Sequence, residues 1–145
     1  MSEVEIESLK LENQISFPLY AAAREVMNLY TPYLQQLGIT YTQYLVFTVL
    51  WEEDGVPVKN ITEKLHLDTG TLTPLLQKME KAGYVRKKRS RKDERVVKVF
   101  LTEKGKALQE EAARIPAAVG SSIPLEPEEE RALYGLLNKL LAAKQ

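Results

Sequence analysis

The amino-acid sequence predicts a mainly α-helical protein with a small β hairpin near its centre. Apolar residues recur every three or four positions along most of the chain, as amphipathic helices require. Two runs rich in β-branched and basic residues, YVRKKR and RVVKVFL, flank the segment SRKDE, a pattern typical of a hairpin. A length of 145 residues suits a single domain.

The composition fits a globular protein and argues against several other classes. The chain is 44% apolar and 28% charged, which is ordinary for a soluble domain. Its longest apolar run is far shorter than the roughly 18 residues that span a bilayer. The acidic N-terminus MSEVEIESLKLE does not resemble an export signal. We therefore expect a cytoplasmic protein without a membrane partner. The absence of cysteine excludes disulfides and thiolate zinc sites.

The first helical segment carries an apolar stripe from Leu11 to Leu29 that Pro18 interrupts. Because proline cannot donate a hydrogen bond to the carbonyl four residues before it, two layouts remain open. Either a bent helix begins near residue 8, or a helix begins near Ser16 with that hydroxyl as its N-cap. The segment is expected to end between Pro32 and Gly38.

Two further helices are expected before the most informative part of the chain. Thr40 and Gln43 have the spacing of a capping box, and they begin an apolar helix that Gly55 ends. The segment VPVKNITEKLHL is then expected to form a short helix with Ile61 and Leu65 turned inward.

The next helix is expected to run from Asp68 to Lys81. Asp68 is its predicted N-cap and Gly83 its C-terminal stop. Pro74 lies inside it, so the carbonyl of Gly70 should lose its helical partner. The inner face of this helix comprises Leu72, Leu75, Leu76 and Met79.

The chain is expected to end in two more helices. Thr102 begins the first, which Pro116 bends or ends, and Pro127 lies in the first turn of the last. The last helix carries a stripe of Leu133, Leu136, Leu137, Leu140 and Leu141. A small central domain cannot cover the stripes of both the first and the last helix, so the simplest solution is a twofold homodimer. Packing of three helices within one chain is the alternative.

These elements predict a winged helix-turn-helix fold, in the α+β class. The DNA-binding region would span about residues 40–102, and the helical dimerisation region about residues 8–38 and 103–145, within one domain of residues 1–145. Between Arg86 and Lys98, eight Lys or Arg stand against Asp93 and Glu94, a balance of +6 in a chain whose net charge is zero. Positive charge gathered on one hairpin beside one helix indicates double-stranded DNA as the partner.

The candidate DNA-binding residues lie on this helix and hairpin. The second helix of a helix-turn-helix enters the major groove; its outward residues here are Thr69, Gly70, Thr71, Thr73, Gln77 and Lys78. An ordinary solvated helix face is the alternative interpretation of this set. The candidates in the hairpin are Arg86, Arg91, Lys92 and Arg95. Asp93 is expected to hold the Arg95 guanidinium by paired hydrogen bonds, or else to be a simple turn residue.

Enzyme classes find little support in the sequence. It contains no P-loop, GxGxxG, HExxH or GxSxG motif. His66 is the only histidine, so neither a histidine metal cluster nor a serine–histidine pair can form. We therefore expect a non-enzyme without cofactor or metal. A protein-interaction module whose basic hairpin binds an acidic partner is a further alternative, although its threonine-rich face lacks an apolar anchor.

Several motifs closely resemble the MarR family of winged-helix transcriptional regulators. They are LDTGTLTPLLQKMEKAGYV, the DER of the hairpin and the LTEKG that follows. The segments LENQISFPLYAAAREV, LYTPYL and LGITYTQYLVFTVLWE resemble the branch that includes the organic-hydroperoxide-sensing repressors (OhrR) and related staphylococcal regulators. The resemblance covers nearly the whole chain.

The resemblance implies a dimeric repressor on a pseudo-palindromic operator, which leaves its DNA when a sensor cysteine is oxidised. The cysteine's usual position is Ser16 here, and its usual partners match Tyr20, Tyr30 and Tyr41, the last two from the other subunit. A serine hydroxyl cannot be oxidised to a sulfenic acid or form a disulfide, as a cysteine thiolate can.

Two explanations of Ser16 stay open. Either the serine was introduced to lock a repressor in its DNA-binding state, or a natural regulator has lost peroxide sensing. Pro18 also departs from the residue expected beside the sensor. A response to a small apolar or phenolic ligand instead of peroxide is the alternative signal.

Overall fold

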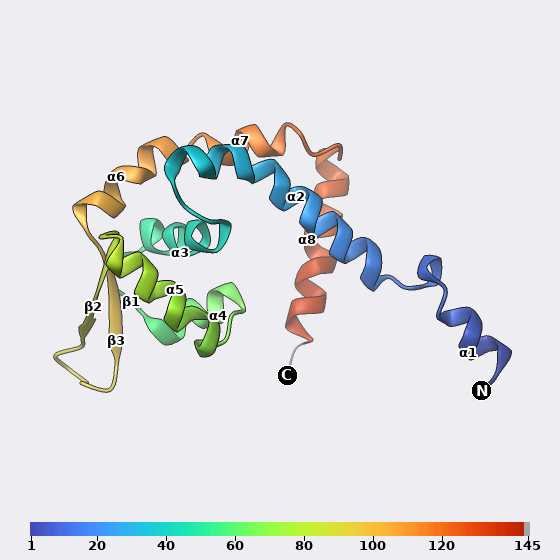
Figure 1. The fold of residues 1–145 in the computed structure, drawn as a ribbon, viewed down its shortest axis with the longest axis horizontal. Helices are drawn as coiled ribbons and strands as arrows, with labels where there is room; N and C mark the ends of the chain where they lie inside the picture. The colour runs from blue at the N-terminus through green and yellow to red at the C-terminus, as the bar shows by residue number, and fades with distance from the viewer. Residues whose placement is uncertain (144–145) are drawn as a thin grey trace. The chain divides into compact units, whose positions relative to one another are not determined.

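The computed structural model describes residues 1–143. It consists mainly of helices with one small antiparallel sheet (Figure 1). The chain divides into two compact units, residues 1–115 and residues 116–145, and each is described by itself. No helix within the described residues is long and apolar enough to cross a membrane.

The N-terminal segment forms three separate helices. The short helix α1 (Glu3–Ser8) has a capping box from Ser2, the 3-10 helix η1 (Leu11–Asn13) follows, and α2 spans Ser16–Leu37. The layout with a helix beginning at Ser16 is confirmed, and the bent helix from residue 8 is wrong. The predicted cap by Ser16 is also wrong, because Ile15 occupies the N-cap position and no side chain caps the helix.

Pro18 lies in the first turn of α2, where the backbone N–H groups have no helical partner and the proline costs little. At the other end, α2 continues past Pro32 to Leu37, and Gly38 follows in the left-handed conformation with φ +71°. Glycine adopts this conformation without steric cost, which fixes the end of the helix.

Helix α3 (Tyr41–Glu52) supplies the centre of the core. The predicted capping box is present, with the backbone N–H of Gln43 donating to the Thr40 hydroxyl at 3.2 Å and that of Thr40 donating to the Gln43 side chain at 3.0 Å. Phe47 and Leu50 are almost fully buried. The turn after α3 contains Gly55 at φ +71°, where the ring of Phe100 leaves no room for a Cβ.

A third strand replaces the expected start of the next helix. Val56 and Pro57 form β1 (Val56–Pro57), with Val56 opposite Val99 and Pro57 opposite Lys98 of β3. Helix α4 therefore begins two residues later and spans Val58–Leu65. The helical prediction for residues 56 and 57 was wrong because pairing with β3 holds the backbone of Pro57 extended, at φ −59° and ψ 143°.

Helix α5 (Thr69–Lys81) and the hairpin follow the prediction closely. The Asp68 side chain accepts from the backbone N–H of Thr71 at 2.7 Å, and Gly83 follows the helix at φ +84°. Strands β2 (Val85–Arg89) and β3 (Val97–Leu101) pair antiparallel, in the sheet order β1-β3-β2. Figure 1 shows the hairpin projecting beyond the helices α3, α4 and α5.

The C-terminal helices begin at α6 (Glu103–Ala112), with Thr102 as its N-cap. Pro116 does not bend this helix but lies in the first turn of α7 (Ile115–Gly120). In the second unit, α8 (Pro127–Ala142) starts at Pro127 with an acidic first turn, as predicted. Its apolar stripe is exposed, with Leu136 and Leu140 62% and 59% accessible.

Candidate nucleic-acid interface

Helix α5 has two sharply different faces. Leu72, Leu76 and Met79 are buried almost completely, because a helical period of 3.6 residues brings these positions to one side. The predicted contact residues are exposed on the rest of the surface: Thr69, Gly70, Thr71, Thr73, Gln77 and Lys78. Most lie near the N-terminus of the helix, where exposed N–H groups and the positive end of the dipole favour phosphate.

The loop between β2 and β3 is held by its own hydrogen bonds. The Arg89 guanidinium donates to the backbone carbonyl of Glu94 at 2.9 Å, and the N–H of Ser90 donates to the carbonyl of Val96 at 2.8 Å. Arg91 and Lys92 are exposed at the tip. These two cations are therefore presented to solvent on an ordered turn.

Asp93 and Arg95 form the pair that the sequence predicted. The Arg95 guanidinium donates to both carboxylate oxygens, at 3.1 Å from Nε and 3.2 Å from a terminal nitrogen, and its backbone N–H donates to Oδ1 at 3.1 Å. These hydrogen bonds hold the pKa of the Asp93 carboxyl below its usual value. The Arg95 side chain is nevertheless 91% exposed, so its charge is oriented but not shielded.

Glu80 connects α5 to the hairpin, a contact that the sequence analysis missed. Its carboxylate accepts from the backbone N–H of Lys87 at 3.3 Å, and its other oxygen lies 3.9 Å from the Lys87 ammonium. The spacing of the two residues along the chain gave no helix or strand pattern from which the contact could be predicted. It adds a polar link between helix α5 and strand β2.

Arg86 lies apart from the other predicted contact residues. Because side chains alternate along a strand, it points to the sheet face opposite Lys87 and Glu80. There it lines a hollow of about 320 Å³ with Asp54, Lys88 and Lys106. The structure therefore does not bring Arg86 together with the exposed face of α5.

The predicted sensor residues fall into two groups within one chain. Ser16 and Tyr20 lie near the start of α2, whereas Tyr30 is 14 residues after Ser16 on the same helix, or roughly 21 Å from it at 1.5 Å per residue. Ser16 and Tyr20 are exposed. One chain cannot bring these two groups together, so the complete set would need a second copy.

Tyr30 and Tyr41 form an aromatic cluster with a third tyrosine, Tyr44, which the sequence analysis did not select. The ring centroids are 5.0 Å apart for Tyr30 and Tyr41, and 5.7 Å apart for Tyr30 and Tyr44. Burial raises the pKa of all three phenols. The hydroxyls are therefore protonated at neutral pH and able to donate hydrogen bonds.

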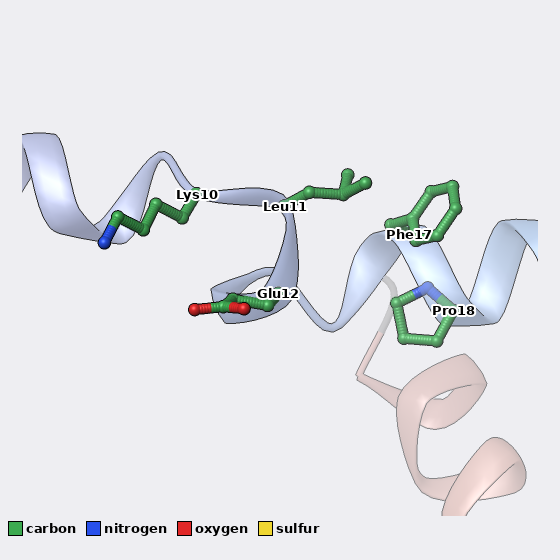
Figure 2. Close-up of a pocket in the computed structure, with 5 residues that line it drawn as sticks. All are labelled: Lys10, Leu11, Glu12, Phe17 and Pro18. Atoms are coloured by element: carbon green, nitrogen blue, oxygen red, sulfur yellow. The ribbon is translucent and has the colours of Figure 1, made fainter.

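A hollow of about 810 Å³ adjoins the start of α2. Figure 2 shows the five residues that line it, with Phe17 and Pro18 projecting from the first turn of the helix beside Lys10, Leu11 and Glu12. Phe17 is 44% exposed and Ile15 77% exposed. The described residues contain no group of three His, Asp or Glu side chains placed to hold a metal ion.

Comparison with known proteins agrees with this arrangement. Residues 28–112 match the family model described as transcriptional regulator SarA/Rot. The organic hydroperoxide resistance transcriptional regulator of Bacillus subtilis is 44% identical over 95% of this chain and 97% of its own length. The chain belongs to the MarR family of winged-helix transcriptional regulators.

Solved structures of MarR-type proteins have the same fold. The structure of reduced AbfR bound to DNA covers 97% of this chain and 98% of its own, with 33% identity and a TM-score of 0.77. A MarR transcriptional regulator from Methanosarcina mazei covers 97% of this chain and 96% of its own, with 26% identity and a TM-score of 0.72. The MarR fold predicted from the sequence is therefore confirmed, and the chain is a transcriptional regulator.

Proposed function

We propose that this MarR-family regulator binds pseudo-palindromic operator DNA as a homodimer and represses transcription. Each subunit would insert α5 into the major groove and place the loop of residues 90–94 beside it. The observation that carries the proposal is the exposed polar face of α5 beside an ordered cationic loop, in which Asp93 holds the Arg95 guanidinium. The DNA-bound AbfR structure supports the same assignment.

The two parts of this interface would contribute differently. Thr69, Thr71 and Gln77 can hydrogen-bond to base edges or contact thymine methyl groups, and so supply specificity. Lys78, Arg91, Lys92 and Arg95 would meet phosphates or the minor groove and supply salt-dependent affinity. Gly70 would allow close approach to the DNA backbone, and Thr73 lies on the same exposed face. Arg86 would contribute little to these contacts, because its side chain points to the opposite face of the sheet.

Exposed apolar side chains on both terminal regions support a homodimer. Ile15 and Tyr20 are 77% and 63% exposed at the start of α2, and leucines form an exposed stripe on α8. An isolated chain would leave this apolar surface in water, whereas a second copy could cover it. We assign about residues 8–38 and 103–145 to dimerisation, and about residues 40–102 to DNA binding, within one MarR-type domain of residues 1–145.

We assign Ser16 to the position of the peroxide-reactive cysteine, which makes this chain insensitive to peroxide. The hydroxyl can hydrogen-bond with Tyr20 of its own chain and with Tyr30 and Tyr41 of a partner, but it cannot form a sulfenic acid. The regulator would therefore remain in the state that binds DNA. Its similarity to the Bacillus subtilis hydroperoxide regulator supports this assignment.

A ligand-responsive regulator is the second candidate. The three protonated phenols of Tyr30, Tyr41 and Tyr44 could donate to a small phenolic or carbonyl compound. Such a compound would raise the melting temperature of the wild-type protein and release DNA without any thiol. A peroxide response created by a cysteine at position 16 would instead favour the redox assignment.

The proposed function is tested with purified protein and the DNA upstream of its own gene. Sedimentation should give a dimer, and fluorescence anisotropy should give binding that weakens steeply as salt rises. A monomer that does not bind this DNA even in dilute buffer would contradict the proposal.

Replacing Asp93 by alanine is expected to weaken operator binding on the order of 30-fold, since each of the two sites would lose affinity several-fold, although the change removes a negative charge near DNA. The physical reason is that Arg95 loses the partner that orients it. If Asp93 were a simple turn residue that repels phosphate, affinity measured by anisotropy would rise instead. Glu94→Ala, which removes an equal charge next to the pair, is the matched control and should not weaken binding.

A further inference from the structure

We propose that Thr102 and Lys104 are positioning residues that lock the end of α5 to the start of α6, and so set the spacing between the two recognition helices of the dimer. The inference rests on the proposed DNA-binding function. Neither residue belongs to the surface assigned to DNA. We call the contacts among residues 82–84 and 102–105 the α5–α6 junction.

The junction satisfies backbone groups at the ends of both helices. The Thr102 hydroxyl donates to the carbonyl of Gly83 at 2.6 Å, with the carbonyl of Tyr84 at 3.1 Å, and accepts from the N–H of Gly105 at 3.2 Å. The backbone N–H of Thr102 donates to the carbonyl of Tyr84 at 3.0 Å. The N–H groups in the first turn of a helix otherwise lack partners, so Thr102 caps α6 and also binds two residues between α5 and β2.

Lys104 adds a second link. Its ammonium donates to the carbonyl of Ala82 at 2.8 Å, and it lies 4.8 Å from the centre of the Tyr84 ring. The carbonyls at the end of α5 carry the negative end of the helix dipole, which a cation stabilises. Lys104 therefore bridges from the first turn of α6 to Ala82, the C-cap residue that follows the recognition helix.

Gly105 lets the two segments approach closely. A Cβ at this position would overlap the carbonyl oxygen of Tyr84, and Gly105 is buried. Its own carbonyl accepts from the indole nitrogen of Trp51 at 3.0 Å. The Trp51 ring stacks on Phe47, which contacts the ring of Tyr84 edge-on at 5.2 Å. Helix α3 therefore braces the junction from the core.

Helix α6, itself part of the region assigned to dimerisation, contacts another long helix of that region. It packs against α2, and the Arg114 guanidinium just after α6 donates to the Gln36 side chain of α2 at 3.2 Å. A rigid junction would thus transfer the position of the dimerisation helices to α5. A loose junction would let each recognition helix turn independently.

The dependence of binding affinity on the spacing between operator half-sites distinguishes the two possible roles of Thr102 and Lys104. Residues that position α5 should change this dependence, whereas residues that only stabilise the fold should not. Each base pair inserted between half-sites shifts one half-site by about 3.4 Å and rotates it by about 35°. A rigid dimer should lose on the order of tenfold in affinity for such a duplex, since both subunits cannot engage well at once. The probes are the duplex that wild-type protein selects from a random pool, and its versions with one base pair inserted or removed at the centre.

Thr102→Val should lose most of this preference for one spacing, whereas Thr102→Ser should keep it. Thr40→Val is the matched control, because Thr40 caps α3 through the same kind of bond, also 3.2 Å from its hydroxyl to a backbone N–H, far from the junction. If Thr102→Val keeps the spacing preference while its melting temperature falls as that of Thr40→Val does, Thr102 is only a helix cap and the proposal is wrong.

A second pair of variants covers the case in which Thr102→Val does not fold. Lys104 is exposed, so Lys104→Met should fold and should lower the spacing preference. Lys106→Met, in the same turn but paired with Glu103 of its own helix, should not. If Lys104→Met keeps the same preference for one operator spacing as Lys106→Met, the proposed role of the junction is wrong. The proposal that the protein binds DNA would then still stand. A wild-type protein that selects no duplex would overturn the proposed function itself, and the junction with it.

Discussion

Replacing Arg95 by alanine is expected to weaken operator binding by on the order of 100-fold at moderate salt. Each dimer would lose two guanidinium groups that Asp93 holds in position, at 3.1 Å and 3.2 Å from its carboxylate oxygens. The change would also leave the Asp93 carboxylate without its partner on the surface that we propose to face phosphate. The loss of the Arg95 charge and the repulsion between Asp93 and phosphate would therefore both lower the affinity for DNA.

The salt dependence of binding identifies the lost contact. If Arg95 meets phosphate, the slope of log affinity against log salt should become shallower by about two, one for each subunit. Arg86→Ala is the matched control, since it removes the same charge from the opposite face of the sheet, where the side chain lines a hollow with Asp54 and Lys106. Equal affinities for the Arg95 and Arg86 variants would show that the charge of the hairpin acts only at long range.

Ser16→Cys is expected to make DNA binding sensitive to organic hydroperoxide, whereas the wild-type protein should stay bound. A thiolate attacks the peroxide O–O bond, giving a cysteine sulfenic acid and releasing the alcohol. The added oxygen would disturb the tyrosine hydroxyls around it. Release of most of the bound DNA is the expected result, measured by anisotropy before and after addition of cumene hydroperoxide.

The absence of other cysteines makes this experiment unambiguous. Mass spectrometry can follow oxidation of a single thiol in each chain, and Ser16→Ala is the control that tests steric effects at the same position. If the cysteine variant is shown to be oxidised and still holds its DNA, position 16 is not the sensor position. A ligand-responsive regulator would then be favoured.

The sequence predicted the elements whose signals are local. Capping by Thr40 and Asp68 depends on side chains within three residues, and the stop at Gly83 depends on one left-handed residue. Such signals do not depend on the rest of the fold. The pair of Asp93 and Arg95 belongs to the same class, because its members are only two positions apart.

The elements that were missed depend on distant partners. Val56 and Pro57 form a strand only because Val99 and Lys98 lie opposite them, and two residues carry no period of their own. The Glu80 contact with Lys87 and the junction at Thr102 likewise connect different secondary-structure elements. The periodicity of the sequence describes each element by itself and does not predict such contacts. The N-cap predicted at Ser16 failed because the helix begins one residue earlier than a capping serine would require.

The link between Glu80 and Lys87 has a consequence for redesign of sequence preference. The Glu80 carboxylate of helix α5 contacts Lys87 of strand β2. Replacing only the helix with that of a related regulator could therefore remove this contact. The portable segment is the continuous stretch from Asp54 to Gly105, because strand β1 pairs with β3 and the Asp54 side chain accepts from the N–H of Leu101 at 2.8 Å. Chimeras joined inside that stretch should place the hairpin incorrectly relative to α5. Chimeras joined at its ends should bind the DNA sequence that the donor regulator prefers.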